Sequence, residues 1–166
     1  MLNIPPWDSL HPLVIHFPIA LLLVAPLFLF IGAVMRVERG RLFAFAALLL
    51  MVLGTAGAWL AVATGESAAE VTAPNAAMKA NIEQHEELAE STRAVFTVLT
   101  LAYAAIVLLP FLQGQARRMI TTALPLAFLV IYVAGAVLLA KTAHEGGRLV
   151  HELGSSAPAV AEADHD

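Results

Sequence analysis

Six histidines are the residues of this chain with the clearest capacity for chemistry. One of them, His16, belongs to the segment 11–20, which opens an apolar run that continues to Met35. Hydrocarbon offers no hydrogen bond to a ring nitrogen, so a histidine inside a membrane-spanning helix is a candidate functional residue that needs a partner. The plainer alternative is a ring satisfied by a neighbouring helix or by interfacial water. Which residues could face His16 depends on the elements that the rest of the chain forms.

The composition is that of a membrane protein. Of the 166 residues, 60% are hydrophobic and 13% are charged, whereas a soluble domain has about a quarter charged residues. Four uncharged runs, each near the roughly 20 residues with which a helix crosses a bilayer, cover residues 13–35, 42–64, 94–112 and 119–140. They do not alternate as barrel strands do. We predict an all-α integral membrane protein, a bundle of four transmembrane helices within residues 1–154, followed by a disordered acidic tail at 155–166.

Two short basic loops orient these helices. The connection after the first run contains Arg36, Arg39 and Arg41, and the connection after the third contains Arg117 and Arg118. Short loops rich in arginine remain on the cytoplasmic side of a membrane. We therefore predict a multi-pass protein of the bacterial inner membrane, with both termini and the second connection in the periplasm.

Helices three and four are expected to extend beyond the outer face of the membrane. The second connection, residues 65–93, is longer than a passive loop, and much of it reads as helix that continues into the run at Ala94. The fourth helix can continue past Ala140 across a pair of glycines. In that case His144 and His151 lie two turns apart on one face.

Small residues form a stripe at helical spacing along the second helix. They are Gly54, Gly57 or Ala58, Ala61 and Gly65. The common meaning of such a stripe is close helix packing in a membrane bundle. A smooth face of this kind could instead admit a flat macrocycle.

In this topology every histidine falls on the outer side: His11, His16, His85, His144, His151 and His165, the last in the tail. From the helical rise, His16 lies roughly 5 Å inside the outer boundary and His144 roughly 6 Å outside it. His85 and His151 lie roughly 13 Å and 16 Å beyond the same boundary. Two depth-matched pairs follow, His16 with His144 and His85 with His151. His11 also matches His144 in depth, but it lies about 140° around the helix from His16, so those two cannot share one ligand.

Paired imidazoles from facing helices suit the axial ligation of haem b in a bundle core. The haem propionates need cations nearby, and the outer side offers Arg93, Lys141 and Arg148. The alternative for these three residues is that they only extend toward water from helix ends. A Zn²⁺ or Cu²⁺ site built from His85, His151 and nearby glutamates is also open. The chain has no cysteine, which excludes disulfides, thiolate clusters and covalent c-type haem.

The histidine motifs resemble a bacterial membrane family catalogued as domain of unknown function 2231. The residues that carry the resemblance are His11-Pro12, His16-Phe17-Pro18-Ile19-Ala20, Thr64-Gly65, His85, and His144-x-Gly146-Gly147-x-Leu149-Val150 followed by Gly154. The resemblance covers residues 10–154. It implies a four-helix architecture in which the matching histidines matter. Some relatives are joined to redox modules, which implies electron transfer.

We therefore predict a non-enzymatic haem b electron-transfer protein, or a subunit of a respiratory or photosynthetic complex. It is expected to hold one or two haems near the periplasmic side. His16 and His144 are the first expected ligands, with His85 and His151 as a second pair or as substitutes. The expected surroundings are the lipid bilayer and a larger redox complex or a periplasmic cytochrome c, not nucleic acid. Two alternatives are open: a cofactor-free accessory subunit, and a periplasm-facing zinc- or copper-binding membrane protein.

Overall fold

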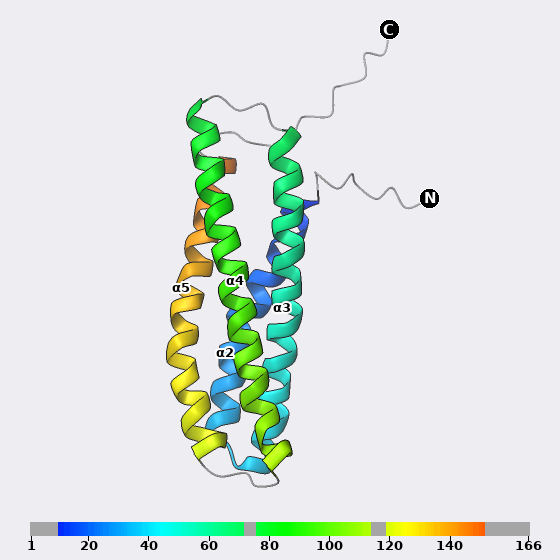
Figure 1. Ribbon diagram of the computed structural model, residues 1–166, viewed down its shortest axis with the longest axis vertical. Coiled ribbons are helices and arrows are strands. Elements are labelled where there is room, and N and C mark those ends of the chain that lie inside the picture. The colour runs from blue at the N-terminus through cyan, green and yellow to red at the C-terminus, as the bar shows by residue number, and fades with distance from the viewer. Residues whose placement is uncertain (1–9, 72–75, 114–118, 152–166) are drawn as a thin grey trace, which may run out of the picture.

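The structure, a computed structural model, describes residues 10–71, 76–113 and 119–151. These residues form long helices that run side by side and contain no strand (Figure 1). The elements are α1 (His11–Val14), α2 (His16–Val34), α3 (Val37–Val71), α4 (Ala76–Gln113), the π-helical turn η2 (Met119–Ala123) and α5 (Leu124–His151). Four stretches are long and apolar enough to cross a membrane: 11–34, 37–69, 78–109 and 121–150. The predicted all-α bundle with four membrane helices is confirmed.

The first span is built from two helices because of a proline. Pro18 has no amide hydrogen, so it cannot bond the carbonyl of Val14, where α1 ends. Only this hydrogen bond is interrupted: Ile15 keeps helical backbone angles (φ −60°, ψ −32°) and bonds the His11 carbonyl, and α2 begins at His16. Pro26 lies inside α2 without ending it. The interruption sets α1 apart from α2 as a short element, with His11 at its first position.

The small-residue stripe of α3 packs against α2. A Cβ atom placed on Gly54 would lie 2.7 Å from Cγ of Leu22, and one on Gly57 would lie 3.2 Å from Pro18. Helix packing is therefore the structural role of these two glycines. Of the two interpretations of the stripe, the structure supports packing along this part of the helix.

The core below the histidines is aromatic and hydroxyl-bearing. Tyr132 and Phe96 meet edge to face with ring centroids 5.5 Å apart, and the Tyr132 hydroxyl donates to the Leu22 carbonyl at 2.7 Å. Threonine hydroxyls link α3 to α4 (Thr55 with Thr100, 2.8 Å) and α4 to α5 (Thr92 with Thr142, 2.7 Å). Inside a bilayer no water is present to hydrogen-bond these hydroxyl groups, so the helices bond them to one another.

Three helices of the bundle are longer than their apolar runs. α4 begins at Ala76 and α5 continues to His151, which confirms that these two helices run as single rods past their apolar runs. α3 also continues beyond Thr64 to Val71, through helix-forming residues that the sequence analysis had left in a connection. We call the end that holds His11 and His85 the histidine end, and the end that holds Arg36, Arg39 and Arg41 the arginine end. The predicted tail at 155–166 lies outside the described residues.

Candidate functional site

His11 is fixed by the neighbouring helix α3. Its Nδ1 atom lies 2.9 Å from the carbonyl oxygen of Ala61 and 3.2 Å from the hydroxyl of Thr64. A carbonyl oxygen only accepts hydrogen bonds, so the proton of the neutral ring is on Nδ1. The lone pair is then on Nε2, the atom that a metal ion would use.

His85 of α4 faces α5 at the same end of the bundle. Its ring lies against the backbone of Thr142. Its Nδ1 atom is buried and has no hydrogen-bond partner among the described residues. A buried polar atom without a partner costs free energy, and it calls for a functional explanation. A ligand at this nitrogen would remove that cost.

Two glycines make room for the two rings. A Cβ atom on Gly65 of α3 would lie 3.0 Å from Cε1 of His11, and one on Gly146 of α5 would lie 2.9 Å from Cε1 of His85. Both distances are too short for an ordinary carbon contact without movement of the ring. Each imidazole thus lies against a helix backbone where a side chain is missing.

The two histidines lie close to one another. The charged forms of His11 and His85 would repel each other, while Glu145 of α5 attracts His85. Glu145 is itself paired with Arg148 at 2.8 Å. The site therefore brings together residues from α1, α3, α4 and α5, four elements that are far apart in the sequence but share the histidine end (Figure 1).

Several carboxylates lie near one another on α3 and α4 toward the histidine end. Glu86 of α4 is repelled by Glu66 of α3 and by Glu83 and Glu90 of its own helix. The negative potential of these side chains favours the approach of cations to the histidine end.

The four predicted ligands differ in their exposure and in their neighbours. His16 is exposed, and its Nδ1 atom lies 2.9 Å from the carbonyl of Pro12 one turn earlier. His144 is also exposed. The side chain of His151 lies outside the described part of the chain. Of the four predicted ligands, only His85 is thus near enough to His11 for the charges of the two rings to interact.

The predicted propionate partners have their own contacts. The guanidinium of Arg93 lies 4.4 Å from the ring centroid of Trp59 and 3.7 Å from Glu90. Arg148 pairs with Glu145, and Lys141 is exposed. Arg93 and Arg148 both flank the histidine end, where they can balance negative charge.

Comparison with known proteins identifies the family. The model of a family described as "Predicted membrane protein (DUF2231)" matches residues 8–157. This chain belongs to that family. No curated protein and no solved structure matches this chain. The resemblance proposed from the sequence is therefore confirmed over almost the whole DUF2231 chain.

The fold explains why the motifs of this DUF2231 protein are spaced as they are. His11, Thr64-Gly65, His85 and Gly146 are separate in sequence but meet at the histidine end. His16 was the first expected ligand because it lies inside an apolar run, and His11 was expected to match His144 in depth. The signal that could have found His11 is its pairing with a glycine: a ring on one helix and a missing side chain on its neighbour.

The donor set is limited to two imidazoles. Among residues 10–71, 76–113 and 119–151, no group of three histidine, aspartate or glutamate side chains is arranged to hold a metal ion. His11 and His85 could act only in a centre that needs two protein ligands, or in one completed by water or by residues outside these ranges.

Proposed function

We propose that this protein is a membrane-embedded haem b electron-transfer protein, in which His11 and His85 would hold the haem. The observation that supports the proposal is that imidazoles from α1 and α4 lie at one end of the bundle, near enough for their charges to interact. Nε2 of His11 is directed by the hydrogen bond at Nδ1, and Nδ1 of His85 has no partner in the described residues.

The number of protein ligands favours haem over a bare structural ion. The porphyrin supplies four of the six iron ligands, so two histidines complete the set. A structural zinc site needs about four protein ligands, and the described residues offer no such group. When bound, the haem would carry one electron per turnover between ferric and ferrous iron.

The side chains around the pair suit a haem in two respects. The two glycines Gly65 and Gly146 let the rings lie close to the helix backbones, which fixes the ring planes. Arg93 and Arg148 are paired with Glu90 and Glu145, and propionates would have to compete with these carboxylates for them. The hydrogen bond from His11 Nδ1 to a backbone carbonyl holds the ring and raises its basicity as a ligand.

We also propose an orientation and a partner. Arg36, Arg39 and Arg41 are exposed at one end, and the positive-inside rule places that end in the cytoplasm of a bacterial cell. The histidine end and both termini would then face the periplasm. Its carboxylates would attract a basic soluble cytochrome c, or the protein would serve as a subunit of a larger redox complex. Association with such a cytochrome should slow as salt concentration rises; a salt-independent rate would contradict this partner.

The deciding experiment is the absorption spectrum of the detergent-purified, dithionite-reduced protein. We expect a haem b α-band and a positive pyridine haemochrome test. His11→Ala and His85→Ala should each lose the band. The exposed pair should behave differently, so His16→Ala and His144→Ala should keep it. A colourless protein would contradict haem binding, and loss of the band only in the exposed pair would restore the ligands expected from sequence.

A bare copper or zinc ion is the second candidate. The carboxylates Glu66, Glu86 and Glu145 around the histidine end support it, because they attract cations. Imidazole nitrogen binds both metals well. Elemental analysis that finds copper or zinc in place of iron, with loss of the metal in His11→Ala and His85→Ala, would favour this function. A metal-free and colourless protein would instead favour a cofactor-free accessory subunit.

A further inference from the structure

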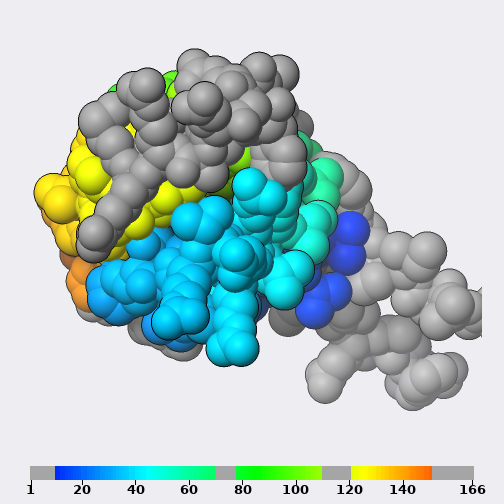
Figure 2. All heavy atoms as spheres, turned by 90° about the horizontal axis from the view of Figure 1, so that it is seen from below, coloured from blue at the N-terminus to red at the C-terminus, as the bar shows by residue number. Residues whose placement is uncertain are grey.

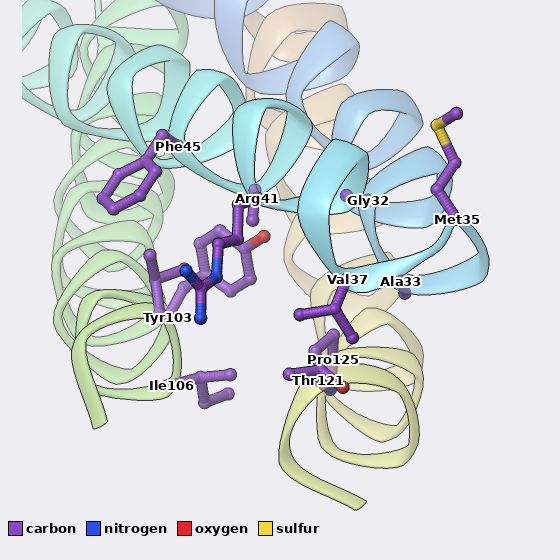
Figure 3. A pocket seen from close by; sticks show the side chains of 13 residues that line it. Gly32, Ala33, Met35, Val37, Arg41, Phe45, Tyr103, Ile106, Thr121 and Pro125 are labelled. Carbon is purple, nitrogen blue, oxygen red and sulfur yellow. The ribbon is translucent and has the colours of Figure 1, made fainter. Parts of the chain in front are cut away.

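A second feature, far from the histidines, is a cavity at the arginine end. It lies between the end of α2, the start of α3, α4 and the η2–α5 junction, and its volume is about 60 Å³. Ala33, Ala44, Ile106 and Val107 give it an apolar wall. Figure 3 shows the Arg41 side chain reaching from α3 toward this space, with Val37, Thr121 and Pro125 across from it. The cavity is therefore apolar inside and carries a guanidinium on its lining.

The surroundings of the cavity are positively charged. Arg36 and Arg39 are exposed beside it, with Glu38 as the acidic side chain of the same turn. Figure 2 views this end of the bundle and shows the cyan atoms around the start of α3 next to the yellow atoms of α5. This excess of arginine attracts anions, and it lies where the charge-free run that starts at Leu42 begins. The cavity thus sits at the level where hydrocarbon gives way to lipid headgroups.

The size of the cavity limits what it can hold. A space of about 60 Å³ holds a few water molecules, because one water molecule needs a cavity of about 10–15 Å³. A complete small metabolite would not be enclosed. Most of a larger ligand would lie outside, against the exposed apolar side chains of Val34, Leu42 and Phe45. A ligand with an anionic group at one end and an apolar remainder fits both the guanidinium in the cavity and the apolar surface outside it.

We propose that this cavity is a binding site for an anionic phospholipid. The phosphate group is held by the guanidinium of Arg41, and the first carbons of an acyl chain enter the apolar part beside Ala44 and Ile106. The remaining chain lies along the exposed apolar surface of α2 and α3. Basic pockets between transmembrane helices are suited to anionic headgroups, and a guanidinium binds phosphate in a fixed, forked geometry.

Native mass spectrometry of the detergent-purified protein tests this proposal. The probes are phosphatidylglycerol and phosphatidylcholine with identical acyl chains. We expect the wild-type protein to retain phosphatidylglycerol preferentially. Arg41→Gln should weaken that retention roughly fivefold, the effect of about one basic residue on an anionic lipid. Ala44→Met, which keeps the arginine but occupies the cavity, should weaken it as well.

Arg39→Gln is the matched control, because Arg39 is exposed on the first turns of α3 but does not line the cavity. It should retain phosphatidylglycerol as the wild type does. Equal losses in Arg39→Gln and Arg41→Gln would overturn the proposal, since the lipid would then respond only to surface charge. Equal retention of the two lipids would also overturn it. If inorganic phosphate raises the melting temperature as much as phosphatidylglycerol does, the ligand of this cavity is a free anion and not a lipid.

Discussion

Gly146 and Gly147 are neighbours in α5 with opposite surroundings. A Cβ atom on Gly146 would lie 2.9 Å from the ring of His85, whereas one on Gly147 would meet no atom within 4 Å. Alanine is a better helix former than glycine by about 0.8–1.0 kcal/mol. The two positions therefore separate the intrinsic gain in helix propensity from the cost of displacing the histidine.

We predict opposite effects of alanine at these two positions. Gly147→Ala should stabilise the protein by up to about 1 kcal/mol. Gly146→Ala should be less stable than Gly147→Ala by about 1–3 kcal/mol, because the His85 ring must move. It should also lose the bound haem or metal. Thermal unfolding and metal content of the two purified variants check this. Equal behaviour of the two variants would show that the ring does not depend on Gly146.

At this scale the residue types are readable from the sequence, but their partners are not. Glu90 and Arg93 have the i, i+3 spacing that favours an ion pair along a helix, and they lie 3.7 Å apart. Depth along a helix is readable from sequence, whereas the packing of the His11 ring against Ala61 and Thr64 of α3 is not.

Among the elements, α2 and α3 depend most on small residues. A Cβ atom on Gly54 would lie 2.7 Å from Cγ of Leu22, which is fully buried and cannot easily move. A Cβ atom on Gly135 of α5 would lie 2.8 Å from Cδ1 of Leu99, the far end of a flexible side chain. The added methyl group of alanine would therefore meet a side chain that cannot move at Gly54 and one that can move at Gly135.

We expect Gly54→Ala to destabilise the protein by about 1–3 kcal/mol through overpacking against α2. Gly135→Ala should cost less, because the Leu99 methyl can rotate away. Melting temperatures in the same detergent measure the difference. A Gly54→Ala variant as stable as Gly135→Ala would mean that α2 and α3 can separate without cost.

For the whole molecule, the central question is which end faces which compartment. The chain has no cysteine, so a single introduced thiol reports one position. Arg39 and Lys79 are both exposed, near opposite ends of the bundle. In the orientation that we propose, Arg39 faces the cytoplasm.

In intact cells, a membrane-impermeant maleimide should label Lys79→Cys but not Arg39→Cys. Permeabilised cells should show labelling of both, which confirms that the thiols are reactive. Labelling of Arg39→Cys alone in intact cells would reverse the proposed orientation and place the histidine end in the cytoplasm.

The sequence by itself determined the architecture of this protein. Four uncharged runs near the length of a bilayer crossing leave helices as the only way to satisfy the backbone, and the structure has four such helices. The extension of α4 could also be predicted, because no helix breaker interrupts residues 76–93, whereas that of α5 depended on the helix crossing Gly146 and Gly147. The further length of α3 could not, since residues 65–71 carry no apolar periodicity that marks them as helix.

Only the tertiary structure decided which histidines meet. His11 and His85 lie 74 positions apart in the sequence, and their proximity depends on how α1 packs on α3 and α4 on α5. The glycines that receive the two rings are on those neighbouring helices, at Gly65 and Gly146. A helical period places a side chain on a face of its own helix. It does not state which face of another helix lies opposite, because that depends on the packing of all the helices together.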